Sequence, residues 1–375
     1  MPAQAAPNGR NVSPTGTDSG NCAKMPCRTI GYAISQAKPG DRILVQPGRY
    51  AESLQVTKSL KLLATDSKDG DDGGALAPVT GAAAESSPDV VIDAAGHDNG
   101  VVIDGPDTAG TVMRGFAVRN ANLEGVLVER TSDVTIVDNL IANNDLLWNP
   151  NNVPQACQSS DDCGEALHLN SVTDSVLRNN TVQNNVGGIL LTDELGGPSA
   201  RNRIVNNTVV DNDKDCGITL ASHYFSMAGP APAAVGGIYD NTVIRNESSR
   251  NGAAGIGIFA GPPGAAAYRN TVSSNVADSN GLPGVAMHAH APFQYFEDNV
   301  VTANTLSRNG ADDDAQTGAP TGITLWSAVV PIHHTTIARN RISHEYYGVY
   351  MANTVAVDGL TTNRFDDVVV PISMH

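Results

Sequence analysis

The chain has 375 residues, a formal net charge of −16 at pH 7, 37 glycines and only 5% aromatic residues. The acidic charge argues against a nucleic-acid or anionic-membrane partner, because both require surfaces rich in Lys and Arg, and no apolar run approaches membrane-spanning length. The length permits a large core, in two domains or one long solenoid. Abundant Gly, Asn and β-branched residues without helix-period stretches favour an all-β repeat protein.

The amino-terminal part predicts a capped beginning of a repeat array. Residues 1–21 are expected to form an extended lead-in, and their start resembles a mature terminus with an added Met. Thr29–Ala37 predicts a short amphipathic helix that Pro39 and Gly40 stop, and Asp41–Gln46 then alternates as a strand. A helix before the first strand suits a solenoid, whose open end exposes core and unpaired backbone groups.

Two motifs alternate from Val90 onward. One is a short apolar alternating strand, opened at Gly125, Ala166, Gly188, Gly217, Gly255, Gly284, Gly322 and Gly348. The other is an asparagine turn before a further strand, at Asn139, Asn180, Asn207, Asn241, Asn270, Asn299 and Asn340. Equivalent residues of stacked parallel strands lie about 4.8 Å apart, and asparagines at that spacing can hydrogen-bond one another and tolerate left-handed turns. The coupled motifs therefore predict stacked coils.

The cap pattern of residues 29–52 and the coupled repeats resemble the pectin-lyase-like right-handed parallel β-helix superfamily, from about Cys22 to about Asp367. The resemblance implies an all-β, single-domain right-handed parallel β-helix over residues 22–375, with a short N-terminal capping helix. This superfamily includes polysaccharide lyases, uronan epimerases, hydrolases, copper-delivery proteins and phage tailspikes. The resemblance thus implies the fold more strongly than the activity.

The excess length of some repeats predicts loop insertions. They are expected at about residues 146–164, 225–235 and 311–320, with a shorter one at Gly261–Ala267. Loops that leave a β-helix on one side can wall a groove for an elongated polymer. Tolerated insertions without function remain the alternative.

The cysteines predict an exported protein. Cys22 and Cys27 are close in sequence, as are Cys157 and Cys163, and such local pairs in loops are typical of disulfides formed outside the cytoplasm. Cys216, in a strand context, is expected to be a buried free thiol. We therefore expect a secreted or periplasmic location.

Stacking the glycine-led strands brings polar residues to one outer face. Strand alternation points the second and fourth residues after each opener outward. These positions, and the strand exits just beyond them, hold His168, Asp193, Glu194, His223, His288, His290, Trp326 and Tyr350. Phe259 shares the fourth position, whereas Lys214 and Asp215 precede the opener Gly217.

Residue chemistry suggests roles on this face. His and Tyr can exchange protons and a carboxylate can orient an imidazole, so the expected catalytic residues are His168, Asp193, His223, His288 and Tyr350. The expected substrate contacts are Glu194, Trp326, Phe259 and Lys214. A divalent metal (copper, zinc or calcium) is a possible cofactor, because two imidazoles on one strand face suit a transition metal; its expected ligands are His223, His288, His290, Asp193 and Asp215. Packed histidines and turn-capping carboxylates remain the alternative.

These observations favour an extracellular carbohydrate-active enzyme that holds a polysaccharide in a groove on the side of the β-helix. The favoured reaction is β-elimination or related proton abstraction next to a carboxylate, as the resemblance to lyases and uronan epimerases implies. A bound metal could neutralise that carboxylate, since few cationic residues lie nearby. Two alternatives stay open: a glycoside hydrolase that uses Asp193, Glu194 or Asp215, and a copper- or zinc-binding β-helix without turnover.

Overall fold

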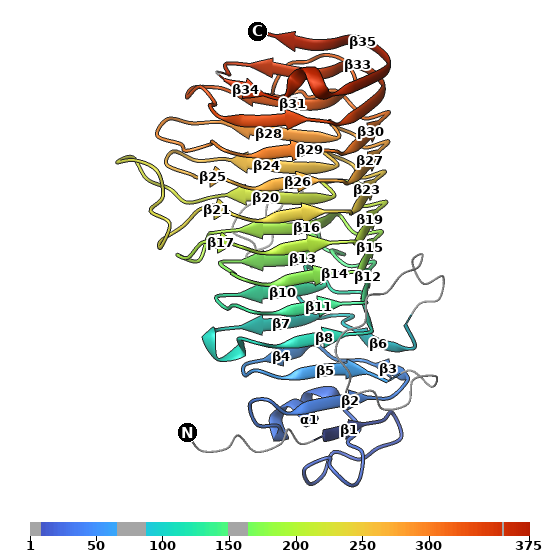
Figure 1. Cartoon of the computed structure of the whole chain (residues 1–375). Coiled ribbons are helices and arrows are strands. Elements are labelled where there is room, and N and C mark those ends of the chain that lie inside the picture. The colour runs from blue at the N-terminus through green and yellow to red at the C-terminus, as the bar shows by residue number, and fades with distance from the viewer. Residues whose placement is uncertain (1–8, 66–87, 149–163, 355) are drawn as a thin grey trace.

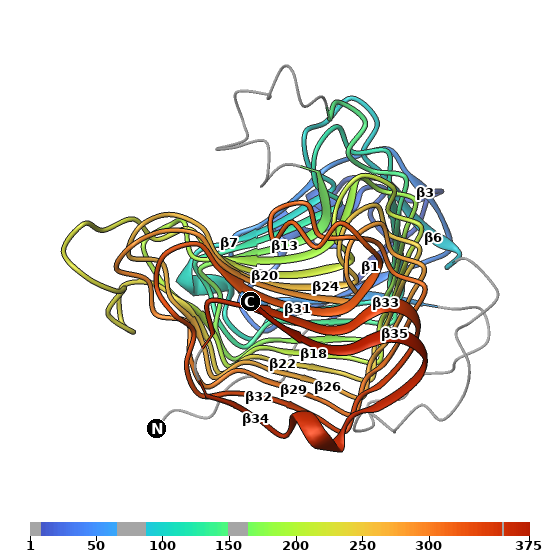
Figure 2. The same ribbon diagram turned by 90° about the horizontal axis from the view of Figure 1, so that it is seen from above.

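The computed structural model describes residues 9–65, 88–148, 164–354 and 356–375. Its strands form a parallel solenoid whose coils stack along one axis, with the amino and carboxyl ends at opposite ends of the stack (Figure 1). Viewed down the axis, the coils superpose around a common interior (Figure 2). The predicted all-β fold, a parallel β-helix with one short helix, is confirmed. No helix among the described residues is long and apolar enough to cross a membrane.

The solenoid has three parallel faces. A twelve-stranded sheet forms the first face from β1 (Gly9–Val12), β2 (Arg42–Val45), β5 (Lys61–Ala64), β8 (Val112–Arg114), β11 (Thr135–Val137), β14 (Val176–Arg178), β18 (Arg203–Val205), β22 (Thr242–Ile244), β26 (Thr271–Ser273), β29 (Val300–Thr302), β32 (Thr335–Ala338) and β34 (Val357–Asp358). The second face stacks β3 (Gly48–Tyr50), β6 (Val90–Asp93), β9 (Phe116–Arg119), β12 (Leu140–Ala142), β15 (Thr181–Gln183), β19 (Thr208–Val210), β23 (Glu247–Ser249), β27 (Val276–Asp278) and β30 (Thr305–Ser307).

The third face, here called the site face, contains the glycine-led strands. It stacks β4 (Leu54–Val56), β7 (Val101–Asp104), β10 (Val126–Glu129), β13 (Glu165–Asn170), β16 (Gly187–Thr192), β20 (Ile218–Ser222), β24 (Ile256–Ala260), β28 (Val285–Ala289) and β31 (Thr321–Ser327). The long strands β33 (Arg341–Ala352) and β35 (Arg364–Met374) run across the second and third faces. A small sheet of β17 (Ser199–Ala200), β21 (Ile238–Tyr239) and β25 (Ala267–Tyr268) extends one corner, and short 3-10 turns lie at Pro106–Thr108 and Leu360–Thr362.

The amino-terminal helix forms where the sequence predicts it. Helix α1 covers Ile30–Gln36, and the Thr29 side chain accepts the Tyr32 backbone N–H as its N-cap. Its buried residues, Ile30 among them, pack into the main core. Strand β1, inside the segment expected as a lead-in, pairs in parallel with β2, so part of that segment completes the first coil.

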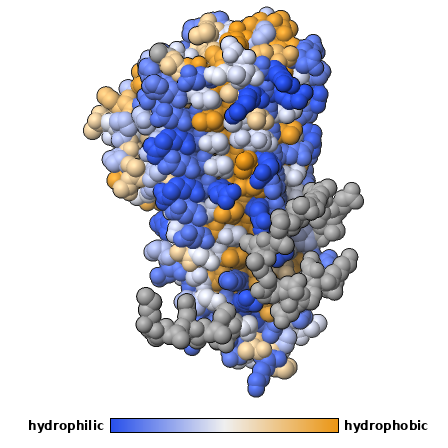
Figure 3. All heavy atoms as spheres, in the orientation of Figure 1, coloured by the Kyte–Doolittle hydropathy of each residue, from blue (hydrophilic) through white to orange (hydrophobic). Residues whose placement is uncertain are grey.

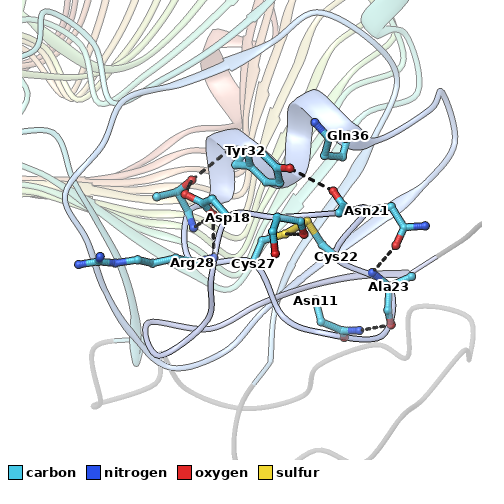
Figure 4. The surroundings of a disulfide bond; sticks show 12 residues. Asn11, Asp18, Asn21, Cys22, Ala23, Cys27, Arg28, Tyr32 and Gln36 are labelled. Atoms are coloured by element: carbon cyan, nitrogen blue, oxygen red, sulfur yellow. Dashed lines mark hydrogen bonds between the residues drawn. A yellow bond between two sulfur atoms is a disulfide. The ribbon is translucent and has the colours of Figure 1, made fainter.

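The cysteines agree with the expectation where the structure describes them. Cys22 and Cys27 form a disulfide that lies next to α1 (Figure 4), and Tyr32 Oη donates to the Gly20 carbonyl at 3.2 Å beside it. Cys216 is free and buried, as expected. The expected Cys157–Cys163 pair lies outside the described residues, as does most of the expected insertion at 146–164.

Three buried asparagine ladders, not one, hold the corners of the solenoid. The sequence motif mixes two corners, because asparagines recur at five-residue intervals within one coil, as in Asn202, Asn207 and Asn212. Within each ladder the side-chain oxygen of one asparagine accepts the backbone N–H of the asparagine one coil earlier and, except at Asn202, also its Nδ2. The longest ladder runs through Asn139, Asn180, Asn207, Asn246, Asn275, Asn304, Asn340 and Asn363. Asn241, Asn270 and Asn299 belong to a different ladder, with Asn202.

The third ladder ends on an acid. Asn309 donates its backbone N–H and its Nδ2 to Glu345 Oε1, at 2.9 and 3.0 Å. Glu345 is buried, and its Oε2 has no hydrogen-bond partner. Burial, together with the charge of Asp278, raises the pKa of Glu345 to about 7.

This position predicts a pH-dependent stability. The folded state binds a proton at Glu345 more tightly than the unfolded chain, so stability is greatest at low pH and falls as pH rises towards about 7. A shift of this size corresponds to on the order of 3 kcal/mol. We expect Glu345→Gln to unfold at a higher denaturant concentration than the parent at pH 8, and to match it near pH 5. Exposed Glu247→Gln is the control; equal pH profiles for the two variants would contradict this account of Glu345.

Candidate active site

The register of the site face agrees with the stacking inferred from the repeats. Leu127 pairs with His168, which pairs with Leu190, and the column continues without a slip to Tyr350. Exposure differs from the expectation, because His168 and Tyr350 are only 3% and 9% exposed. The outer surface of this column is covered, and the more accessible imidazoles, of His223 and His290, lie at strand exits.

His288, on β28, is held in place by a carboxylate and two aromatic rings. Its Nε2 lies 2.7 Å from Asp312 Oδ2, and both side chains are buried. Phe259 from the preceding coil and Trp326 from the following coil make edge contacts with the imidazole, each at a centroid distance of 5.4 Å. Asp312 also accepts the Ala315 backbone N–H, so the loop after β30 closes over this histidine.

His290 lies beside His288 at the exit of the same strand. The two imidazole centroids are 5.5 Å apart, and Trp326 contacts His290 at 5.4 Å. One ligand atom each of His288, His290 and Asp314 lies within 4.8 Å of the others, which suits a metal ion. Two imidazole nitrogens and one carboxylate oxygen match the donor preference of copper or zinc better than the all-oxygen preference of calcium.

The electrostatic surroundings of His288 and His290 favour metal binding. Burial, together with the charge of His288, lowers the pKa of His290. Burial acts against ionisation of Asp312, but the hydrogen bond and charge of His288 hold its pKa below the usual value. His290 is therefore mainly neutral near pH 7, the form that binds a metal or accepts a proton.

A second carboxylate–imidazole pair lies at the exit of β20. His223 Nδ1 lies 2.9 Å from Glu194 Oε1, and the His223 side chain is 24% exposed. Glu194 also accepts Asn170 Nδ2 at 2.9 Å. Since a carboxylate that hydrogen-bonds one ring nitrogen fixes the orientation of the other, this pair presents the Nε2 of His223 in a defined direction.

Gly261 separates His223 from His290. The Gly261 backbone N–H bonds the Ser222 carbonyl, and the His290 N–H bonds the Ala260 carbonyl, so the three residues occupy equivalent places on successive coils. At about 4.8 Å per coil, the two histidine backbones lie about 10 Å apart. His223 therefore does not join His288, His290 and Asp314, here called the metal-capable group. Gly261 lies between His223 and His290.

Asp193 has a structural role in the fold. Its carboxylate accepts the Ser222 hydroxyl and the backbone N–H groups of His223, Tyr224 and Gly237. The side chain is buried, and burial raises its pKa. These bonds pin the beginning and the end of the loop between β20 and β21, and Asp193 is not placed with His288 and His290 in the metal-capable group.

His168 lies in a closed buried network. Its Nδ1 is 2.9 Å from Glu124 Oε1 and its Nε2 is 2.8 Å from Thr192 Oγ1. Both ring nitrogens therefore have partners within the protein. This arrangement explains why an imidazole can be buried at this position in the column.

Lys214 and Asp215 lie at the other end of the site face. They precede β20, whereas His223 follows it, and at about 3.3 Å per residue the two ends of this segment lie about 26 Å apart. Lys214 pairs with its neighbour Asp213 at 2.8 Å. The structure therefore does not bring Asp215 to the metal-capable group or Lys214 to the histidines.

Tyr350 lies in the column of the site face, two coils beyond β28 and level with Ala286, about 16 Å from His290. Its ring stacks on His375 at 4.8 Å and contacts Tyr347 at 5.2 Å. Burial, with the charges of Tyr347 and Asp312, raises its pKa. The phenol is therefore protonated at neutral pH, and the negative charge of Asp312 contributes to this.

Sequence reasoning missed the carboxylates that organise His288 and His290. Asp312 and Asp314 lie in the acidic run of the predicted 311–320 insertion, and this run was the available signal. In the part of the chain that the structure describes, no Lys or Arg contacts these side chains. Arginines are instead paired with aspartates at the turns, as in Arg250–Asp211 and Arg269–Asp240.

Two family descriptions match separate parts of the chain. Residues 89–228 match the "Right handed beta helix region" and residues 235–374 match the "Periplasmic copper-binding protein (NosD)". No curated protein matches the chain. The second match spans His288, His290 and Asp314.

Solved structures share the fold at low identity. The A-module of the mannuronan C-5 epimerase AlgE4 from Azotobacter vinelandii has a TM-score of 0.57 at 16% identity, over 92% of this chain and 91% of that chain. The DFA-IIIase from Arthrobacter chlorophenolicus has a TM-score of 0.53 at 12% identity, over 92% and 83%. PfbA, a surface adhesin of Streptococcus pneumoniae, has a TM-score of 0.52 at 13% identity, over 91% and 87%. Together with the family matches, these confirm the predicted resemblance to right-handed parallel β-helix proteins.

The Asp312–His288 bond predicts a site-specific loss of stability. Asp312→Ala leaves a buried imidazole without its acceptor and frees the loop that Ala315 closes, which should cost about 2–4 kcal/mol. Asp313→Ala, at an exposed neighbouring position, should change stability by less than about 0.5 kcal/mol. Urea unfolding of the three proteins tests this, and equal midpoints for both variants would show that Asp312 does not anchor the site.

Proposed function

Because the chain is a right-handed parallel β-helix, a fold that carbohydrate-active enzymes share with adhesins, we propose that it acts on a polysaccharide at the exits of β20, β24 and β28. The observation that carries the proposal is a pair of groups on either side of Gly261. On one side lies His223, oriented by Glu194; on the other lie His288, His290 and Asp314, arranged to hold a metal.

The reaction that these groups support best is proton abstraction next to a carboxylate, leading to β-elimination or epimerisation. His223 is the base, since Glu194 orients its ring and its side chain is partly exposed. The His223 ring lies against Gly261, since a Cβ there would be 3.7 Å from His223 Cδ2, and half-buried Trp326 offers a ring for the sugar to pack against. Tyr350 lies two coils beyond β28 and level with Ala286, so it does not reach this sugar, and the proton returned to the product comes from solvent.

The substrate carboxylate needs a positive partner before its α-proton can be removed, and among the described residues no Lys or Arg bonds His288, His290 or Asp314. His288, His290 and Asp314 would hold a copper or zinc ion, which would supply that charge when bound. Trp326 and Phe259 keep the two imidazoles in place from the neighbouring coils. Asp312 holds His288 so that its Nδ1 faces Asp314, at 3.8 Å.

A second candidate function is metal binding without turnover. It is supported by the same three ligands and by the match of residues 235–374 to a periplasmic copper-binding family. A location outside the cytoplasm fits both candidates. The Cys22–Cys27 disulfide supports such a location, because disulfides persist in oxidising compartments.

The metal group gives a direct prediction. The purified protein, equilibrated with copper or zinc and then desalted, should retain about one metal ion per chain by elemental analysis. His290→Ala should lose most of this metal, whereas His97→Ala, at an exposed position far along the chain, should retain it. Equal metal contents in the two variants would remove His290 from the ligand set.

Turnover separates the two candidate functions. In a panel of acidic and neutral polysaccharides, β-elimination produces an unsaturated sugar that absorbs in the ultraviolet, epimerisation changes the sugar ratio, and hydrolysis produces reducing ends alone. Chelation should abolish the reaction. His223→Ala should lower the rate by about 10²–10⁴-fold while the metal content stays unchanged. Retained metal without any turnover would favour the binding function, and full activity in His223→Ala would exclude this residue as the base.

A further inference from the structure

Beside the candidate site lies a projecting surface without charged side chains. It consists of three loops, residues 224–236, 262–266 and 291–295, here called the uncharged lobe. It projects from the corner near β21 and β25 (Figures 1 and 2). The segments 216–239, 251–268 and 279–296, which contain these loops, lack Asp, Glu, Lys and Arg, although the whole chain has 62 such residues (39 acidic and 23 basic).

The three loops of the lobe are hydrogen-bonded to one another and pack together. Backbone hydrogen bonds join the loops from coil to coil, from Ser226 N–H to the Pro263 carbonyl and from Gly264 N–H to the Pro292 carbonyl. A Cβ on Gly264 would lie 2.6 Å from the Ser226 carbonyl oxygen, so the loops pack tightly there. Below them, Tyr239 stacks on Tyr268 at 5.1 Å, and Tyr268 contacts Tyr295 at 4.9 Å.

Large apolar side chains lie exposed on this support. Phe225 is 65% exposed, Met227 60% and Phe293 45%. Figure 3 shows the same region, at the left edge of the molecule, with pale and orange atoms beside the blue body. Apolar side chains that are exposed together on one packed surface, where water contacts them at a cost in free energy, are typical of a binding face.

The arrangement fits a linear polymer better than a compact partner. Phe225 follows His223 by two residues and Phe293 follows His290 by three, so each exposed ring lies next to one half of the candidate site. The two rings come from loops two coils apart, about 10 Å along the axis. A polysaccharide presents apolar ring faces at regular intervals along its length and can therefore contact both.

We propose that the uncharged lobe is an extended binding surface for the sugar rings of a polysaccharide whose reacting unit lies between His223 and His290. The proposal rests on the function proposed above for that site. It explains how a protein of net charge −16 can hold a long glycan without a basic groove: sugar units away from the reaction site are bound through their apolar faces. Binding should consequently depend on chain length.

Affinity electrophoresis in native gels that contain polysaccharide tests the lobe separately from catalysis. The parent protein should be retarded by a long polymer that it binds or converts, and scarcely affected by the same amount of a trisaccharide of that polymer. Phe225→Ser combined with Phe293→Ser should weaken retardation by about fivefold to tenfold. Val369→Ser, at a 68% exposed site on β35, is the matched control and should behave as the parent.

The outcomes distinguish the lobe from the reaction. Loss of retardation in the double variant, with turnover of short oligosaccharides preserved, supports the proposal. Loss of retardation when no variant shows any turnover supports the lobe and contradicts only the proposed reaction. Unchanged retardation in the double variant overturns the proposal. So does a parent dimer in analytical ultracentrifugation that the double variant abolishes, since the lobe would then bind a second copy of the chain.

Discussion

The hydrogen bonds between stacked asparagines are the constraint on which the rest of this structure depends. A coil of a β-helix must bend sharply at its corners, and backbone groups at those bends cannot pair with a neighbouring strand. Each ladder asparagine satisfies them, since its oxygen accepts two N–H groups from the preceding coil and its Nδ2 reaches a carbonyl, as in Asn246. Because such a bond forms only when the asparagines lie directly above one another, the ladders fix the register of the coils.

Because the register is fixed, equivalent residues of successive coils lie side by side. The fixed register lets loops of very different length leave the same corner without disturbing the strands that follow, so β20, β24 and β28 pair residue for residue despite the loops between them. This property brings His223, Gly261 and His290 into one row. His223, the proposed base, and His290, of the metal-capable group, then occupy neighbouring places, although they are 67 positions apart by subtraction of the residue numbers.

The features that follow the register of the repeats are also those that the sequence could predict. The fold, the capping helix and the column from Leu127 to Tyr350 follow from repeats whose spacing is visible in the chain. The identity of the carboxylate partners does not follow, because Asp312 reaches His288 through a loop that obeys no repeat. The partners of Asp193, a residue placed by the sequence at a strand exit and expected to be reactive, likewise do not follow from the repeats: its carboxylate accepts N–H groups of the loop backbone. Counting the five-residue interval between asparagines would have separated the ladders.

The distribution of charge follows from the same geometry. Corner residues repeat in left-handed conformations on the surface, and there an arginine of one coil lies next to an aspartate of the coil before, as in Arg201 and Asp174. Such exposed pairs contribute little stability each, but they place basic side chains at corners and away from the strand exits beside Gly261. The exits are left with histidines, carboxylates and uncharged loops. Under the proposed function, an ion held by His288, His290 and Asp314 would balance the charge of a glycan bound there, and the sugar units away from the reacting one would contact the uncharged lobe.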